Sequence, residues 1–166
     1  MNKRAAPQWV DGAVNQIRTA AMLIDKLHAL TSPRLAMIDV NATVQAAARS
    51  LSTPGIGLVV VCNGNGGAEG VLSKSDLVRH LVSSASSVPP VSALMSRPIV
   101  SCTPEDDLHG VWQTMAATSL QNMPVVDVGA RPIGILDIRD AMKALFEREE
   151  IQEQMLSNYV AGVGYR

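Results

Sequence analysis

The chain has 166 residues, of which 47% are hydrophobic and only 3% aromatic, so aliphatic side chains and methionine must build its core. The formal net charge is −1 and no stretch is rich in lysine and arginine, which argues against nucleic-acid binding because that binding depends on clustered positive charge. The longest apolar run of interest, residues 56–62, is far too short to span a membrane.

The first half of the chain alternates between helical and extended patterns. Apolar positions at helical spacing predict a leading helix that begins at Asp11 and ends before residues 31–33, which read TSP, because proline disfavours helix in the residue ahead of it. The following elements are then predicted in order: an extended segment at 34–38, a helix capped by Asn41 that buries Val44, Ala47, Ala48 and Leu51, a buried strand at 57–62, a turn at 63–67, a short strand at 70–72 and a helix from Ser73.

The second half repeats this order after a linker rich in serine and proline. Thr103 and Pro104, followed by two acidic residues, predict a helix start, and its buried stripe runs from Leu108 to Met115. The other predicted elements are an extended segment at 98–102, strands at 123–128 and 132–136 around a turn at 129–131, and a last helix that opens at Asp137 and continues past Glu150.

One motif occurs twice in the chain. Residues 70–81 return as residues 134–145, about 64 positions later, with glycine, aliphatic pair, polar cap, aspartate and closing leucine kept in type. A period this long suits two small domains that pack on each other, because one unit of about 60 residues buries too little surface to be comfortably stable alone.

The sequence therefore predicts an α/β fold of two pseudo-symmetric β-α-β-β-α units packed sheet to sheet, with flanking N- and C-terminal helices. The predicted organisation is a tail and leading helix at 1–24, a first unit at 25–83, a linker at 84–91, a second unit at 92–146 and a C-terminal helical extension and tail at 147–166.

Each copy of the motif places a polar residue at a helix start and an aspartate three residues later. These pairs are Ser73 with Asp76, and Asp137 with Asp140. One interpretation is a capping box that only stabilises the helix. The other is a nucleotide site without a P-loop, in which the helix start meets a phosphate and the aspartate accepts hydrogen bonds from two ribose hydroxyls. Recurrence of both acids after the same glycine-aliphatic strand end favours the second interpretation.

Residues 122–127, which read NMPVVD, the tandem β-α-β-β-α arrangement and the Gly-aliphatic-x-Ser/Thr-x-x-Asp pattern resemble a known family. Over about residues 25–150 the chain resembles a pair of CBS domains, named after cystathionine β-synthase and together called a Bateman module. The first repeat departs from the pattern, since Gly57 stands where the second repeat has Met123. The resemblance implies a regulatory role and binding of an adenosine-containing ligand in clefts between the repeats. AMP, ADP and ATP are the first candidates and NAD or S-adenosylmethionine the second, with no cofactor required.

By position, the resemblance implies that Asp76 and Asp140 hold ribose hydroxyls and that Ser73 contacts phosphate. Asp137 departs from the usual serine or threonine, and its carboxylate would repel a phosphate. We therefore expect one tight site centred on Ser73 and Asp76, and a weak or empty second site unless Arg139 or a bound cation offsets Asp137. The residues expected to line the adenine slots are Arg34, Leu35, Ala36, Pro98, Ile99 and Val100, closed on the other side by Gly57, Leu58, Met123 and Pro124.

The favoured prediction is a stand-alone regulatory module that senses an adenine nucleotide and signals to a partner protein that the sequence does not identify. The alternative is a dimerisation or protein-interaction module with vestigial ligand sites. No residue grouping typical of a nucleophile or a metal site occurs in the sequence, so no enzymatic activity is expected.

Assembly and location are predicted from a few positions. The resemblance implies association through helices, and apolar Ile151 and Met155 extend such a surface, so a homodimer is expected. Cys62 and Cys102 stand alone in apolar contexts and are expected to be buried free thiols. Together with the lack of a signal-peptide pattern in residues 1–10, they predict a cytoplasmic protein with no nucleic-acid or membrane partner.

Overall fold

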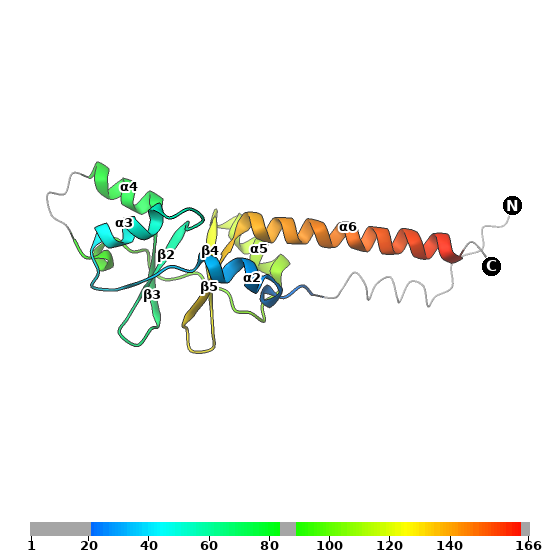
Figure 1. Cartoon of the computed structure of the whole chain (residues 1–166), viewed down its shortest axis with the longest axis horizontal. Helices are drawn as coiled ribbons and strands as arrows, with labels where there is room; N and C mark the ends of the chain where they lie inside the picture. Colours follow the sequence, from blue (N-terminus) through cyan, green and yellow to red (C-terminus); the bar gives the residue numbers. More distant parts are fainter. Residues whose placement is uncertain (1–20, 84–88, 164–166) are drawn as a thin grey trace.

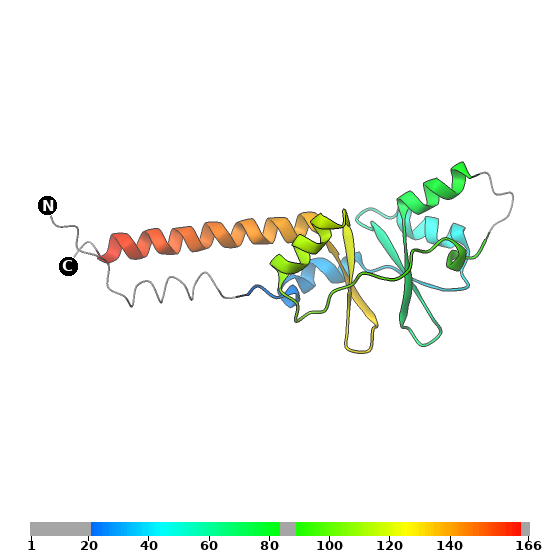
Figure 2. The same ribbon diagram turned by 180° about the vertical axis from the view of Figure 1, so that it is seen from behind.

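The computed structural model describes residues 21–83 and 89–163, with side chains up to residue 158. Two α/β units lie side by side, and their two hairpins extend in the same direction (Figure 1). One long helix, α6 (Ile138–Val163), starts at the second unit and projects well beyond it, as the reverse view in Figure 2 also shows. None of the described helices is both long and apolar enough to cross a membrane.

The first unit holds a three-stranded sheet and two helices. Its middle strand, β2 (Leu58–Cys62), is buried at every position, as expected for a continuous aliphatic run. This strand pairs in parallel with β1 (Met37–Asp39) and antiparallel with β3 (Ala68–Ser73). The helices α3 (Val44–Ser52) and α4 (Lys74–Val82) follow β1 and β3, which gives the predicted β-α-β-β-α order.

The cap of α3 differs from the prediction. Thr43 is the N-cap residue, because its Oγ1 accepts a hydrogen bond from Ala46 N at 3.2 Å. Asn41 lies in the preceding turn, where its backbone N–H donates to Asp39 Oδ1 at 2.8 Å. The turn closed by Asp39 thus uses the position expected to cap the helix, and α3 starts at the next suitable side chain.

The second unit has a two-stranded sheet, so the extended segment predicted at 98–102 forms no strand of its own, and the β-α-β-β-α order predicted for this unit is wrong at its first element. β4 (Asn122–Val126) pairs antiparallel with β5 (Pro132–Asp137). Only Cys102 bridges to β4, through backbone hydrogen bonds of 3.0 and 2.9 Å. Pro98 has no N–H to donate to a ladder, which removes one of the bonds that a longer strand would need.

Helix α5 (Leu108–Ala117) starts later than the sequence signal indicates. The Thr103 N–H donates to Asp106 Oδ2 at 2.7 Å, so these two residues close a turn of their own. Asp107 is the cap instead, because its carboxylate accepts from Gly110 N at 3.0 Å. Two cap-like signals follow one another here, and the second one starts the helix.

The predicted leading helix is a chain of short pieces where it is described, and its residues 11–20 lie outside the described residues. The 3-10 turns η1 (Ile24–Leu27) and η2 (Ser32–Arg34) flank a single α-helical turn, α2 (His28–Thr31). The extended segment predicted at 34–38 starts later in the structure, because η2 continues to Arg34. Its strand is β1, which covers Met37–Asp39. Residues 84–88 of the predicted linker also lie outside the described residues.

Each unit contains, in its core, the segment that precedes the other unit in sequence. Ile24 and Leu27 precede β1, the first strand of the first unit, but are buried against α5, β4 and β5 of the second. Val91, in the 3-10 turn η3 (Val91–Ala93) ahead of the second unit, is buried against α3, β2 and β3 of the first. We call residues 22–31 and 91–95 the exchanged segments.

The repeated glycine of the motif makes room for these exchanged segments. Thr31 packs directly on Gly134, and Met95 packs on Gly70. A Cβ atom at Gly134 would lie 2.9 Å from Thr31 Cβ and 3.2 Å from its carbonyl carbon. The glycine that recurs in the sequence is therefore explained by close packing at equivalent places in the two units.

The two sheets meet through a small apolar contact. Ile135 of β5 is buried with Leu58 and Val60 of β2. Nearer the hairpin tips, Ala68 N donates to the Ala130 carbonyl at 3.1 Å. The predicted fold class, two α/β units packed sheet to sheet, is therefore confirmed.

Candidate functional site

A cleft of about 670 Å³ opens between the two units and is lined by both of them. This volume lies within the range of small-molecule sites, roughly 300–1,000 Å³. The last strand of each hairpin ends at the cleft, so both copies of the repeated motif contribute the start of a helix to it. The lining consists of Arg34 and of residues 55–58, 73–75, 119–122 and 137–139.

The first copy of the motif forms a complete capping box. Ser73 Oγ and N both donate to Asp76 Oδ2, at 2.7 and 2.8 Å, and Asp76 N donates to Ser73 Oγ at 3.4 Å. The other carboxylate oxygen, Asp76 Oδ1, lies 3.1 Å from Arg79 Nη1. Capping is therefore confirmed for this pair, and both carboxylate oxygens of Asp76 already have partners within the first unit.

The second copy of the motif is built around a buried carboxylate. Asp137 is 4% exposed, and its Oδ1 accepts from the Arg139 backbone N at 2.8 Å and from Arg139 Nε at 3.0 Å, while Oδ2 accepts from Nη2 at 2.7 Å. The pKa of Asp137 is lowered, chiefly by the side-chain hydrogen bonds from Arg139, although burial acts in the opposite direction. In the structure Arg139 pairs with Asp137 and offsets its charge. This is the condition under which the second site is not expected to be weak or empty.

Arg34 connects the two units at the cleft. Its Nε and Nη2 donate to Asp140 Oδ2 at 2.9 and 2.8 Å, and its Nη1 donates to the Gly55 carbonyl at 3.2 Å. The same Nη1 lies 4.0 Å from Asp137 Oδ2. Both contacts to Asp140 use the same carboxylate oxygen, Oδ2, and the side chain of Asp140 is 21% exposed. An arginine of the first repeat thus binds the motif aspartate of the second.

The structure brings part of the predicted site together. Asp140 reaches the cleft through Arg34, and Asp76 reaches it through Ser73. Leu35 and Ala36 instead pack in the apolar clusters beside β2. The predicted residues that line the cleft are Arg34, Gly57, Leu58, Ser73 and Asp137, whereas Val100 and Met123 line another cavity and Leu35, Ala36, Pro98, Ile99 and Pro124 line neither.

Sequence reasoning missed the loop between α5 and β4 and the first residue of β4. Ser119, Gln121 and Asn122 all line the cleft. Asn122 lies against Gly57, where a Cβ atom would come 2.7 Å from the Asn122 Nδ2, so the glycine lets the two strand starts approach each other. The available signal was the polar pair Gln121 and Asn122, which precedes the buried positions of β4. That these side chains face the cleft depends on the tertiary arrangement, which the sequence does not give.

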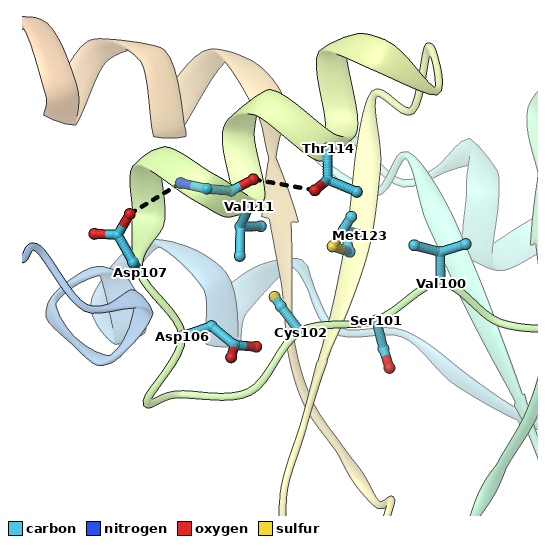
Figure 3. Close-up of a pocket in the computed structure, with 9 residues that line it drawn as sticks. Val100, Ser101, Cys102, Asp106, Asp107, Val111, Thr114 and Met123 are labelled. Atoms are coloured by element: carbon cyan, nitrogen blue, oxygen red, sulfur yellow. Dashed lines mark hydrogen bonds between the residues drawn. The ribbon is translucent and has the colours of Figure 1, made fainter.

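A second cavity of about 320 Å³ lies beside α5 (Figure 3). Val100, Cys102 and Met123 line it. Burial, with a smaller effect from the charge of Asp106, raises the pKa of the Cys102 thiol to about 12. Such a thiol stays protonated and is a poor nucleophile. Within the described residues, no three His, Cys, Asp or Glu side chains gather as metal ligands would.

Comparison with known proteins gives two adjacent matches to the model of the CBS domain, at residues 27–83 and 91–147. The chain is 26% identical over 126 residues to the arabinose 5-phosphate isomerase GutQ of Shigella flexneri, covering 75% of this chain and 39% of that enzyme. It therefore spans well under half the length of that relative.

Solved structures share the fold. The chain is similar to the CBS domain pair of protein MJ0100 in complex with 5′-methylthioadenosine and S-adenosyl-L-methionine, with 19% identity and a TM-score of 0.66 over 78% of this chain and 98% of that one. It is also similar to the CBS domain protein PAE2072 of Pyrobaculum aerophilum complexed with AMP, with 21% identity and a TM-score of 0.64 over 72% of this chain and 89% of that one.

Proposed function

The chain belongs to the CBS domain family, with two domains in tandem, and from this premise we propose that it is a regulatory module that binds an adenosine-containing ligand in the cleft between them. Two proteins with the same fold support the ligand class, since MJ0100 was solved with 5′-methylthioadenosine and S-adenosyl-L-methionine, and PAE2072 with AMP. The ligand would report to a partner protein rather than undergo reaction here.

The charge of the cleft is the observation that carries this proposal. Arg34, Lys74 and Arg139 line it, against a single lining carboxylate, Asp137. That carboxylate is already paired with Arg139. The balance favours an anionic group on the ligand, because guanidinium and ammonium groups bind phosphate by charge-assisted hydrogen bonds.

The remaining parts of such a ligand also have suitable neighbours. Asp140 Oδ1 would accept from the two vicinal hydroxyls of a ribose, since only Oδ2 is used by Arg34. Ile56 and Leu58 supply apolar surface to an adenine ring. Ser73 would donate to phosphate after exchanging its bond with Asp76. This assignment places the principal site at the second copy of the motif.

Saturating AMP is expected to raise the thermal unfolding midpoint. A ligand at 100 times its Kd stabilises the folded state by about 2.7 kcal/mol, and a chain of this size gains roughly 2–4 °C per kcal/mol. The measurement is a thermal-denaturation series with AMP, ADP, ATP, NAD, S-adenosylmethionine and 5′-methylthioadenosine. GMP and ribose 5-phosphate are the controls, and equal stabilisation by either would remove the adenosine requirement. A series in which no adenine compound shifts the midpoint would favour the alternative function, a dimerisation or protein-interaction module with vestigial ligand sites.

A second copy of the chain is the proposed partner for the exposed apolar faces of α4 and α6. Val78 of α4 and Met142 of α6 occupy equivalent positions of the repeat, and both are exposed. Leu81 and Phe146 extend the two faces by one helical turn and are exposed as well. Equivalent faces on two pseudo-symmetric units suit a two-fold dimer, in which each face meets its counterpart.

We expect light scattering of the unmodified chain to give twice its mass of 17.6 kDa. The pair Leu81→Glu and Phe146→Glu should shift the mass to that of one chain, because charge at the centre of an apolar contact opposes association. Val128→Glu is the control, since Val128 is fully exposed at a hairpin tip away from both helices. A mass near 17.6 kDa for the unmodified chain at micromolar concentration would contradict the dimer.

A further inference from the structure

We infer that Asp137 is a positioning residue that holds Arg139 for an anionic group of the ligand. The two residues together would take the place of the hydroxyl donor that Ser73 supplies at the equivalent position of the first repeat. This inference rests on the proposed function and names the group that the cleft recognises. Its first support is the contrast in burial between the partners. The Asp137 side chain is 5% exposed, whereas that of Arg139 is 78% exposed.

The geometry between the two side chains is that of an anchor. Arg139 donates to both carboxylate oxygens of Asp137, from Nε at 3.0 Å and from Nη2 at 2.7 Å. Two parallel bonds of this kind fix the plane of the guanidinium as well as its distance. The N–H groups that do not contact Asp137 belong to a side chain that lines the cleft. A long, exposed arginine is thereby ordered before a ligand arrives, which lowers the entropic cost of binding.

The charges around the pair favour an anion. Arg34 Nη1 lies 4.0 Å from Asp137 Oδ2, while Arg34 itself is bound to Asp140. Lys74 lines the cleft from the first unit. Three cationic groups thus stand against two carboxylates, and one of these is buried beneath Arg139. The lowered pKa of Asp137, due first to the hydrogen bonds from Arg139, is consistent with an ionised anchor.

A capping role alone would not require this arrangement. Asp137 Oδ1 accepts from the Arg139 backbone N at 2.8 Å, and this one bond is the contribution of a cap side chain to the start of α6. The fork from the side chain of Arg139 adds nothing to that function. Asp137→Asn keeps an oxygen that can accept the backbone bond but loses the charge and the paired fork, so it separates the two roles.

The test is calorimetric titration of the full chain with AMP and with 5′-methylthioadenosine, whose 5′ substituent is uncharged. Asp137→Asn should weaken AMP binding about ten- to one-hundred-fold, the range for losing hydrogen bonds to a charged group. Binding of 5′-methylthioadenosine should change less than about twofold. Arg139→Gln should reproduce both results, and the double variant should lose no more AMP affinity than Arg139→Gln alone, because Asp137 acts through Arg139.

Arg131→Gln is the matched control, since Arg131 is an exposed arginine in the β4–β5 turn and should leave both affinities unchanged. Equal losses for AMP and 5′-methylthioadenosine in Asp137→Asn would show a structural role and overturn the inference. Additive losses in the double variant, or unchanged AMP binding in Asp137→Asn, would also overturn it while leaving the proposed function in place. If the unmodified chain binds neither compound, the proposed function and this inference fall together.

Discussion

Replacing Ile24 by alanine is expected to lower the free energy of unfolding by about 2–5 kcal/mol, the usual cost of truncating a fully buried aliphatic side chain. Ile24 is 2% exposed and packs in the core of the second unit, although it precedes the first unit in sequence. The removed atoms would leave a cavity between η1 and α5, and two backbone bonds anchor the surrounding segment, from Ile24 N to Asp106 O and from Asp25 N to Pro104 O, both at 3.0 Å. The site therefore has little freedom to collapse.

The measurement is urea unfolding of the full chain, read as a shift of the transition midpoint at unchanged slope. Leu23→Ala is the matched control, because Leu23 is the neighbouring residue and is 37% exposed. It should cost well under half as much as Ile24→Ala. Equal costs for the two variants would mean that residues 22–31 do not belong to the core of the second unit.

Gly134→Val is expected to destabilise the chain by about 3 kcal/mol or more, the upper range for forcing extra atoms into a packed core. A Cβ atom at this position would lie 2.8 Å from Thr31 Oγ1 and 2.9 Å from Thr31 Cβ. Thr31 is buried and belongs to an exchanged segment, and one of the close atoms is its backbone carbonyl carbon, so relief would require moving the backbone. Valine adds two further methyl groups to this conflict.

Gly64→Val provides the comparison for this substitution. Gly64 lies in the turn between β2 and β3, and a Cβ atom there would meet nothing within 4 Å. Thermal or urea unfolding should therefore place Gly64→Val close to the unmodified chain. A Gly134→Val chain as stable as Gly64→Val would refute the close packing of Thr31 on the motif glycine.

The fold was predictable from sequence where the signals are local. The aliphatic run of β2 and the cap of α4 at Ser73 are complete within a few residues, and the structure has both. The late start of α5 was not predictable in this way, because Thr103 and Asp107 both carry cap-like side chains and only the bond from Thr103 N to Asp106 decides between them. The exchanged segments were not predictable either, since periodicity shows that a face is apolar but not which partner it buries.

For the candidate site, the sequence likewise identified residues of the local motif but not the contacts between residues far apart in the chain. Recurrence of the motif assigned Ser73 and Asp137 to two separate sites, whereas in the structure both residues line the same cleft. The bond from Arg34 to Asp140 joins residues 106 positions apart, and neither residue carries a local sign of the other. The pairing of Asp137 with Arg139 was foreseen only as an exception, because a two-residue spacing at a helix start allows either a solvent-facing arginine or one folded back on the carboxylate.

The exchanged segments have a consequence for how the molecule bears load. The core of the first unit, with Val61, Leu72 and Val91, is contributed by one uninterrupted stretch of chain, whereas the core of the second unit combines Ile24 and Leu27 with residues beyond position 100. In terms of chain topology, the first unit is an insertion within the second. A pulling force applied between residues 22–31 and α6 would load the second unit first, because both points of attachment belong to its core. The inserted first unit would bear force only after the second unit had opened.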